Sequence, residues 1–128
     1  MSFAEPSDGA RIIVEVPSGG YPVTLVGTVQ PGDPISGGST GWQRADASTD
    51  GLRPEMIAGG NGVSGDTIVA YESAILDFGT GCTAVIGSDL FLSDTAGDYS
   101  ASTGTVGYRV GRMIDAQRAY VWGIHSAQ

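Results

Sequence analysis

The fold is decided by the last third of the chain, VIGSDLFLSDTAGDYSASTGTVGYRVGRMIDAQRAYVWGI, residues 85–124. This stretch contains three short apolar runs, at residues 90–92, 107–114 and 119–124, and turn-forming Gly, Asp and Ser residues separate them. Runs of this length with such boundaries are typical of short antiparallel strands. The stretch carries no obvious catalytic group, which favours a structural or binding protein.

Strict alternation assigns the side chains of these runs to opposite faces. In the second run it places on one side Tyr108, Val110 and Arg112, and on the other Arg109, Gly111 and Met113. In the last run it places on one side Tyr120, Trp122 and Ile124, and on the other Val121. Residues 115–118 then form a tight connection between the two strands.

The rest of the chain predicts further strands separated by turns. We expect strands at residues 11–16 and 21–29, and a longer one at residues 67–78 with a bulge where its face assignment shifts. Residues 31–49 are expected to form a loop because Gly, Pro, Ser and Asp dominate there. Residues 52–58 fit one helical turn or a short strand, and the pattern does not decide between them. No segment shows a sustained helical period.

Length and glycine content indicate one domain with many turns. The chain has 128 residues, of which 21 are glycine, well above the roughly 7% of average proteins. Together with 41% hydrophobic residues, this favours tight turns between short strands over disorder. We therefore predict an all-β domain, a compact barrel or sandwich of short antiparallel strands with long Gly-rich loops. Residues 1–10 are expected to form an extended N-terminal arm, and residues 11–128 the single β domain.

Charge excludes several classes of partner. The chain has fourteen acidic residues, six arginines and no lysine, for a net charge of −8. Such a chain repels phosphate backbones, so no nucleic acid is expected as partner. Neither a signal peptide nor an apolar stretch of the ~20 residues that span a bilayer is found, so no membrane is expected either. The only cysteine, Cys82, is expected to be a small buried residue.

Three literal motif matches are weighed and set aside. Residues 60–65 spell G-x-G-x-x-G, but a β run follows where a dinucleotide site needs a helix. Residues 37–41 spell G-x-S-x-G around Ser39, and His125 is the only histidine, but the flanks are loop-like. The acidic set Asp89, Asp94 and Asp98 lacks the spacing of a calcium loop. We expect no metal, no cofactor and no enzymatic activity.

Two of these segments carry a resemblance to a known family. Residues 87–97, GSDLFLSDTAG, are followed by residues 105–111, TVGYRVG, and by a closing apolar run. This succession resembles small capsid decoration (cement) proteins of tailed phages, in which G-D-x-V-Y-L-S-x-x-A-G is followed by R-V-G and a closing hydrophobic strand. The resemblance implies a virion structural protein on the capsid exterior, made in the host cytoplasm, that bridges neighbouring subunits of the major capsid protein.

Candidate interface residues follow from this role. Arg and Trp combine contact area with directional bonds, so they are favoured at interfaces. The candidates are Phe3, Arg11, Trp42, Arg109, Arg112, Arg118 and Trp122. For Trp42 and for Trp122 core packing is the competing interpretation, and for both residues it is the stronger one. Arg44 and Arg53 are interpreted as arginines that solubilise loops.

Other assemblies and functions stay open. Symmetric capsid junctions favour closed rings, so a homotrimer is expected first and a monomer second. A phage tail or fibre module that binds a host glycan is the main alternative. From another class, a small serine hydrolase would use Ser39 and His125.

Overall fold

The computed structural model describes residues 12–16, 20–48, 52–79, 82 and 84–122, and in this part of the chain every regular element is a strand. The strands form two antiparallel sheets that are not closed into a barrel, so the predicted all-β class is confirmed and the architecture is sandwich-like. The expected N-terminal arm lies outside the described residues. Within the described ranges there is no helix that could cross a membrane.

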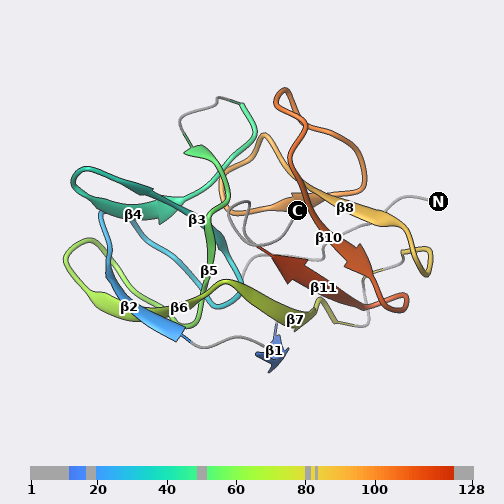
Figure 1. Cartoon of the computed structure of the whole chain (residues 1–128), viewed down its shortest axis with the longest axis horizontal. Coiled ribbons are helices and arrows are strands. Elements are labelled where there is room, and N and C mark those ends of the chain that lie inside the picture. Colours follow the sequence, from blue (N-terminus) through green and yellow to red (C-terminus); the bar gives the residue numbers. More distant parts are fainter. Residues whose placement is uncertain (1–11, 17–19, 49–51, 80–81, 83, 123–128) are drawn as a thin grey trace.

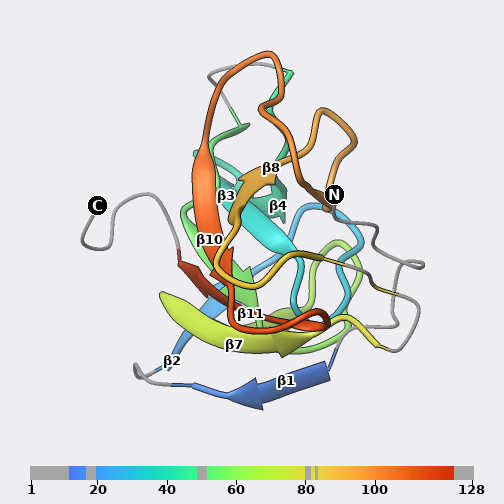
Figure 2. The same cartoon turned by 90° about the vertical axis from the view of Figure 1, so that its right-hand side faces the viewer.

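The larger sheet has six strands, which lie on the right in Figure 1. In spatial order they are β1 (Ile12–Glu15), β7 (Ser73–Asp77), β11 (Arg118–Trp122), β10 (Arg109–Met113), β8 (Asp89–Leu92) and β9 (Tyr99–Ser100). The first of these, β1, forms the outer edge beyond β7 (Figure 2). Four of the six strands come from the C-terminal stretch, and its three short apolar runs predict β8, β10 and β11.

The smaller sheet has five strands and lies on the left in Figure 1. In spatial order they are β2 (Gly20–Thr24), β6 (Thr67–Tyr71), β5 (Met56–Ala58), β3 (Pro34–Gly38) and β4 (Gly41–Arg44). A single bridge joins Leu25, just after β2, to Trp42 in β4, so the two edges of this sheet curl toward each other. The strand predicted at residues 21–29 is shorter than expected, because β2 ends at Thr24. Of the two structures that the sequence allows at residues 52–58, the chain forms the short strand, β5.

The buried side chains form two hydrophobic clusters, and Ile57 of β5 in the small sheet belongs to the larger one. The larger cluster lies on the inner side of the six-stranded sheet and is built on fully buried side chains such as Leu76, Leu90 and Val121. It also contains Cys82, which is buried as predicted. The smaller cluster includes Leu25, Ile35 and four more buried residues of the five-stranded sheet, together with Val29. Burial of each such aliphatic side chain contributes about 1.5–3 kcal/mol.

The long strand predicted at residues 67–78 is two strands in different sheets. Glu72 separates β6 from β7, and the chain passes at this point from the small sheet to the large one. The shift in face assignment is real, but its cause is this crossing and not a bulge within one strand. Ser73 and Ala74 are both buried because the chain changes layers there.

The loop predicted at residues 31–49 is wrong in its central part, where β3 and β4 form a hairpin. Gly37 pairs with Trp42, and a Cβ atom on Gly37 would lie only 2.8 Å from the indole ring. The ring therefore lies directly over the glycine and covers the smaller cluster. The sequence does not reveal this pairing, because the glycines of the hairpin have a low β-propensity. The contact that stabilises the hairpin forms only between side chains and backbone of opposite strands.

A buried ion pair lies where the two sheets meet. Asp33 is fully buried, and its Oδ2 accepts hydrogen bonds from the backbone N–H of Gln30 at 2.8 Å and from Nε of Arg44 at 2.7 Å. At the residue before Asp33, the carbonyl of Gly32 accepts a hydrogen bond of 2.8 Å from the hydroxyl of Tyr99 in β9. Arg44 is therefore a structural residue, and its interpretation as a loop-solubilising arginine is wrong.

We expect Arg44→Ala to lower the free energy of unfolding by about 2 kcal/mol or more, because the buried carboxylate of Asp33 loses a charged partner. The matched control is Arg53→Ala, at an exposed arginine, which should change stability by less than about 0.5 kcal/mol. Urea denaturation of the two variants measures both effects. Equal losses would show that the ion pair adds nothing to stability.

Candidate functional site: an arginine-rich sheet face

Strand β11 presents three large side chains on the outer side of the six-stranded sheet. Its burial alternates, with Ala119 and Val121 buried and with Arg118 and Tyr120 exposed. The alternation is as predicted, but the inward side is the one with the small residues. Trp122 shares the outer side with Tyr120 and is half-buried, so the core-packing interpretation of Trp122 is wrong.

Strand β10 adds two arginines to this outer side. Arg109 and Arg112 are exposed, while Val110, Gly111 and Met113 are buried. The register with β8 shifts between Arg109 and Gly111, so two consecutive residues point inward there. Strict alternation is therefore wrong for this strand, and it places Arg112 and Met113 on the wrong faces. The irregularity brings Arg109 and Arg112 to one face although they are three residues apart.

Arg109 and the aromatic residues of β11 are in contact. Nε of Arg109 donates to Oδ1 of Asp89 at 3.0 Å, and the pair is about half exposed. Its guanidinium carbon lies 5.2 Å from the ring centroid of Trp122, within the range of a cation–π contact. The rings of Trp122 and Tyr120 are 5.6 Å apart and inclined at 49°. These contacts hold a cation and two aromatic rings next to one another on the outer side of the sheet.

Arg112 lies at the centre of this face. The register pairs it with Tyr120 on one side and with Asp89 on the other. The ion pairs formed among the residues described do not include Arg112, although Asp89 lies in the neighbouring strand. We call the outward side chains Arg109, Arg112, Arg118, Tyr120 and Trp122 the arginine face.

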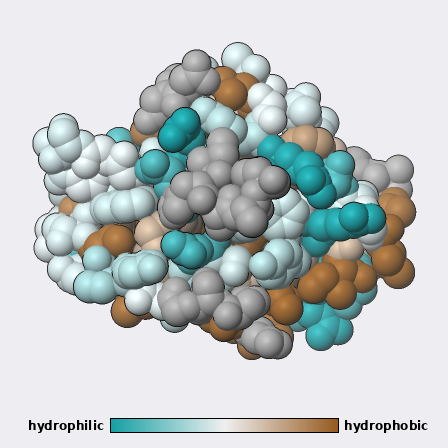
Figure 3. Space-filling view, viewed as in Figure 1, coloured by the Kyte–Doolittle hydropathy of each residue, from teal (hydrophilic) through white to brown (hydrophobic). Residues whose placement is uncertain are grey.

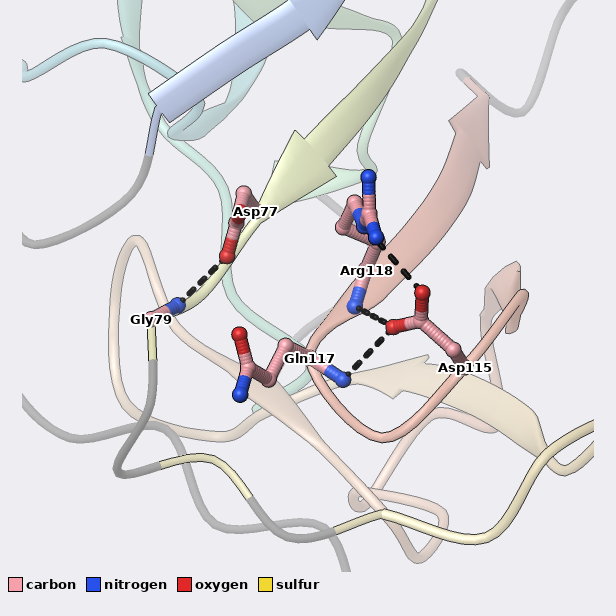
Figure 4. A network of polar contacts seen from close by, with 5 residues as sticks. All are labelled: Asp77, Gly79, Asp115, Gln117 and Arg118. Carbon is pink, nitrogen blue, oxygen red and sulfur yellow. Dashed lines mark hydrogen bonds and ion pairs between the residues drawn. The ribbon is translucent and has the colours of Figure 1, made fainter.

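Arg118 is fixed by the turn that joins β10 to β11 (Figure 4). Oδ1 of Asp115 accepts from the backbone N–H groups of Gln117 and Arg118, and its Oδ2 accepts from Nε of Arg118 at 3.1 Å. The two backbone hydrogen bonds lower the pKa of Asp115 below its ordinary value, and the positive charge of Arg118 adds to this. Asp115 thus caps the tight connection that the sequence predicts.

An apolar tip adjoins the arginine face at the same turn. The segment before β8 runs beside the turn, because the N–H of Ala84 donates to the carbonyl of Ala116 and that of Gly87 to the carbonyl of Met113. Three exposed aliphatic side chains gather there: Val85, Ile86 and Ile114, with Ile86 exposed by 72%. Figure 3 shows hydrophobic residues along the lower right margin, where Figure 1 places the turn between β10 and β11.

The structure brings together four of the seven predicted interface residues, namely Arg109, Arg112, Arg118 and Trp122. Trp42 belongs to the other sheet and covers its cluster. Phe3 and Arg11 lie outside the described residues. Tyr120 and Ile86 were missed; the alternation of β11 could have indicated Tyr120, whereas no sequence signal separates an exposed Ile86 from a buried one.

The residues of the literal motif matches do not form a catalytic or metal site among the described residues. Ser39 is exposed in the turn between β3 and β4, and His125 lies outside the described residues. Asp94 accepts from the N–H and hydroxyl of Thr105, and Asp89 pairs with Arg109, so both act locally. No group of three potential metal ligands forms within the ranges that the structure describes.

Comparison of the chain with protein-family models, with curated proteins and with solved structures gives no significant match.

The lowered pKa of Asp115 predicts an acid-sensitive turn. The carboxylate stabilises the folded chain at pH values above its unfolded pKa, and this contribution is lost as the pH falls through the lower folded pKa. Asp115→Asn should therefore destabilise the protein most at neutral pH. The difference from the unmodified protein should shrink below about pH 4, as denaturation curves at several pH values can measure. A difference that is independent of pH would contradict this role.

Proposed function

We propose that this protein decorates the outside of a phage capsid and stabilises it by bridging neighbouring subunits of the major capsid protein. The observation that carries the proposal is the arginine face. In a chain of net charge −8, three of the six arginines lie on the outer side of β10 and β11, beside Tyr120 and Trp122. This combination of residues is typical of the energetically dominant part of protein interfaces.

The resemblance to decoration proteins involves strands that form part of the same surface. Its two motifs, at residues 87–97 and 105–111, include β8 and much of β10, the strands that carry Asp89 and Arg109. The motif residues therefore supply Arg109 of the arginine face, its partner Asp89 and the start of the loop between β8 and β9. A contact function gives a physical reason for a rigid strand framework beneath exposed arginines, because ordered side chains lose less entropy on binding.

Decoration works through repetition. A single subunit at a junction between capsid proteins adds only one modest interface, but the same interface recurs over the whole shell. The apolar tip of Val85, Ile86 and Ile114 offers further area beside the charged contacts. On this proposal the major capsid protein is the partner, the location is the capsid exterior, and a homotrimer is the first expected assembly, with a monomer second.

One observation favours a second candidate, a tail or fibre module that binds a host glycan. The exposed ring of Tyr120 lies beside the half-buried ring of Trp122, and aromatic rings stack on the apolar faces of sugars. Arg112 and Asp89 lie in the adjoining strands and supply polar groups. A glycan-binding module would bind host cells, which a decoration protein has no need to do.

Binding to capsids tests the proposal. Purified protein added to phage heads assembled without it should co-sediment with them to saturation and raise the temperature at which they rupture. Arg112→Glu should weaken this binding by about tenfold or more, because it reverses the unpaired charge of the face. The matched control is Arg53→Glu, at an exposed arginine on a different segment. Absence of binding by the unmodified protein, or binding to host cells instead, would refute decoration.

A further inference from the structure

The arginines of the arginine face occupy successive rows of the sheet. Arg112 pairs with Tyr120 and therefore shares its row. Arg118 lies two residues before Tyr120 in β11, and Arg109 contacts Trp122, two residues after it. Because a strand rises by about 3.3 Å per residue, these rows repeat at roughly 7 Å. The Cα atoms of the three arginines thus lie in three consecutive rows of the face.

Each guanidinium retains donors for a partner. In Arg109 and Arg118 only Nε is used in the ion pairs with Asp89 and Asp115, so the terminal Nη groups have no partner among the described residues. The guanidinium of Arg112 is unpaired in the same set. Arginine binds carboxylates best through two parallel N–H donors, which such single-donor pairs still permit.

An extended peptide matches this geometry. Its alternate side chains point to the same side, and they also repeat at roughly 7 Å. We propose that the arginine face binds an extended acidic segment of the partner, with carboxylates at every second position. One carboxylate contacts each arginine in turn, while the residues between them pack on Tyr120 and Trp122. This inference rests on the proposed function for the identity of the partner, the major capsid protein, but its chemistry is testable without capsids.

Charge favours a short acidic peptide over nucleic acid. The remaining surface of a chain with net charge −8 repels a long polyanion, whereas a short segment meets the local field of three arginines and their two aspartates, a net charge of +1. Charges beyond about 8 Å are screened at physiological ionic strength, so the local contacts dominate. Binding should consequently weaken as salt increases.

The experiment compares two short peptides of identical composition with the full-length protein. In the first, aspartate and threonine alternate; in the second, the same aspartates are consecutive. We expect the alternating peptide to bind about tenfold more tightly in calorimetric titration, because only it presents all its carboxylates on one side. It should also change the fluorescence of Trp122, and the variant Trp42→Phe isolates that signal from the other tryptophan.

Variants define the contact surface. Arg112→Ala should weaken binding of the alternating peptide by about tenfold, while Arg53→Ala should leave it unchanged. Thermal denaturation of both variants confirms that each is folded. Equal affinity for the two peptides, equal effects of the two variants, or tighter binding of a single-stranded oligonucleotide would each overturn the inference.

The outcomes separate this inference from decoration. If the protein binds heads but does not distinguish the peptides, decoration stands and binding of an extended acidic segment is refuted. If it binds the alternating peptide through Arg112 but does not bind heads, the acidic ligand stands and the capsid assignment is refuted.

Discussion

The fold depends on a carboxylate that has been taken out of water. Asp33 is fully buried between the turn at Gly32 and strand β4, and burial of an unpaired charge would cost several kcal/mol. Nε of Arg44 and the N–H of Gln30 offset that cost. The same contact fixes the end of β4 against the loop of residues 93–98, because a Cβ atom on Gly97, whose φ is +81°, would lie 2.7 Å from Cδ of Arg44. The two sheets are therefore joined by polar contacts of defined geometry, which an apolar contact alone would not provide.

This joint determines which surfaces remain outside. The inner side of the six-stranded sheet packs on the larger cluster. Ile57 of β5 and the Tyr99 hydroxyl, which donates to the carbonyl of Gly32, tie that cluster to the small sheet. In the described part of the chain no second layer covers the outer side of β10 and β11. A sheet with one solvated face normally carries scattered polar residues there. The concentration of arginine and aromatic residues on this one face is instead a feature of contact surfaces.

The sequence predicts those strand faces that depend on local alternation, and it misses the features that depend on pairing with a distant strand. The outer row of β11 can be predicted, because its alternation is unbroken from Arg118 to Trp122, although only the structure shows that Ala119 and Val121 face inward. The faces of β10 cannot, because the register shift with β8 depends on the neighbouring strand. The hairpin of β3 and β4 is hidden for the same reason, since Gly37 becomes a strand residue only beneath the Trp42 ring. The arginines were identifiable one by one, but their common face required the topology.

The two aspartates of the arginine face explain how a dense group of cations is tolerated and oriented. Two unit charges about 7 Å apart in water repel by only about 0.6 kcal/mol, so Asp89 and Asp115 are not needed to prevent unfolding. Their effect is geometric, because each holds one Nε and so restricts the rotamers of Arg109 and Arg118 before any partner binds. Arg112, between them, has no such restraint within the described residues. Its charge is not shared with a carboxylate of that part of the chain, so it gains the most electrostatic energy from a carboxylate supplied by another molecule.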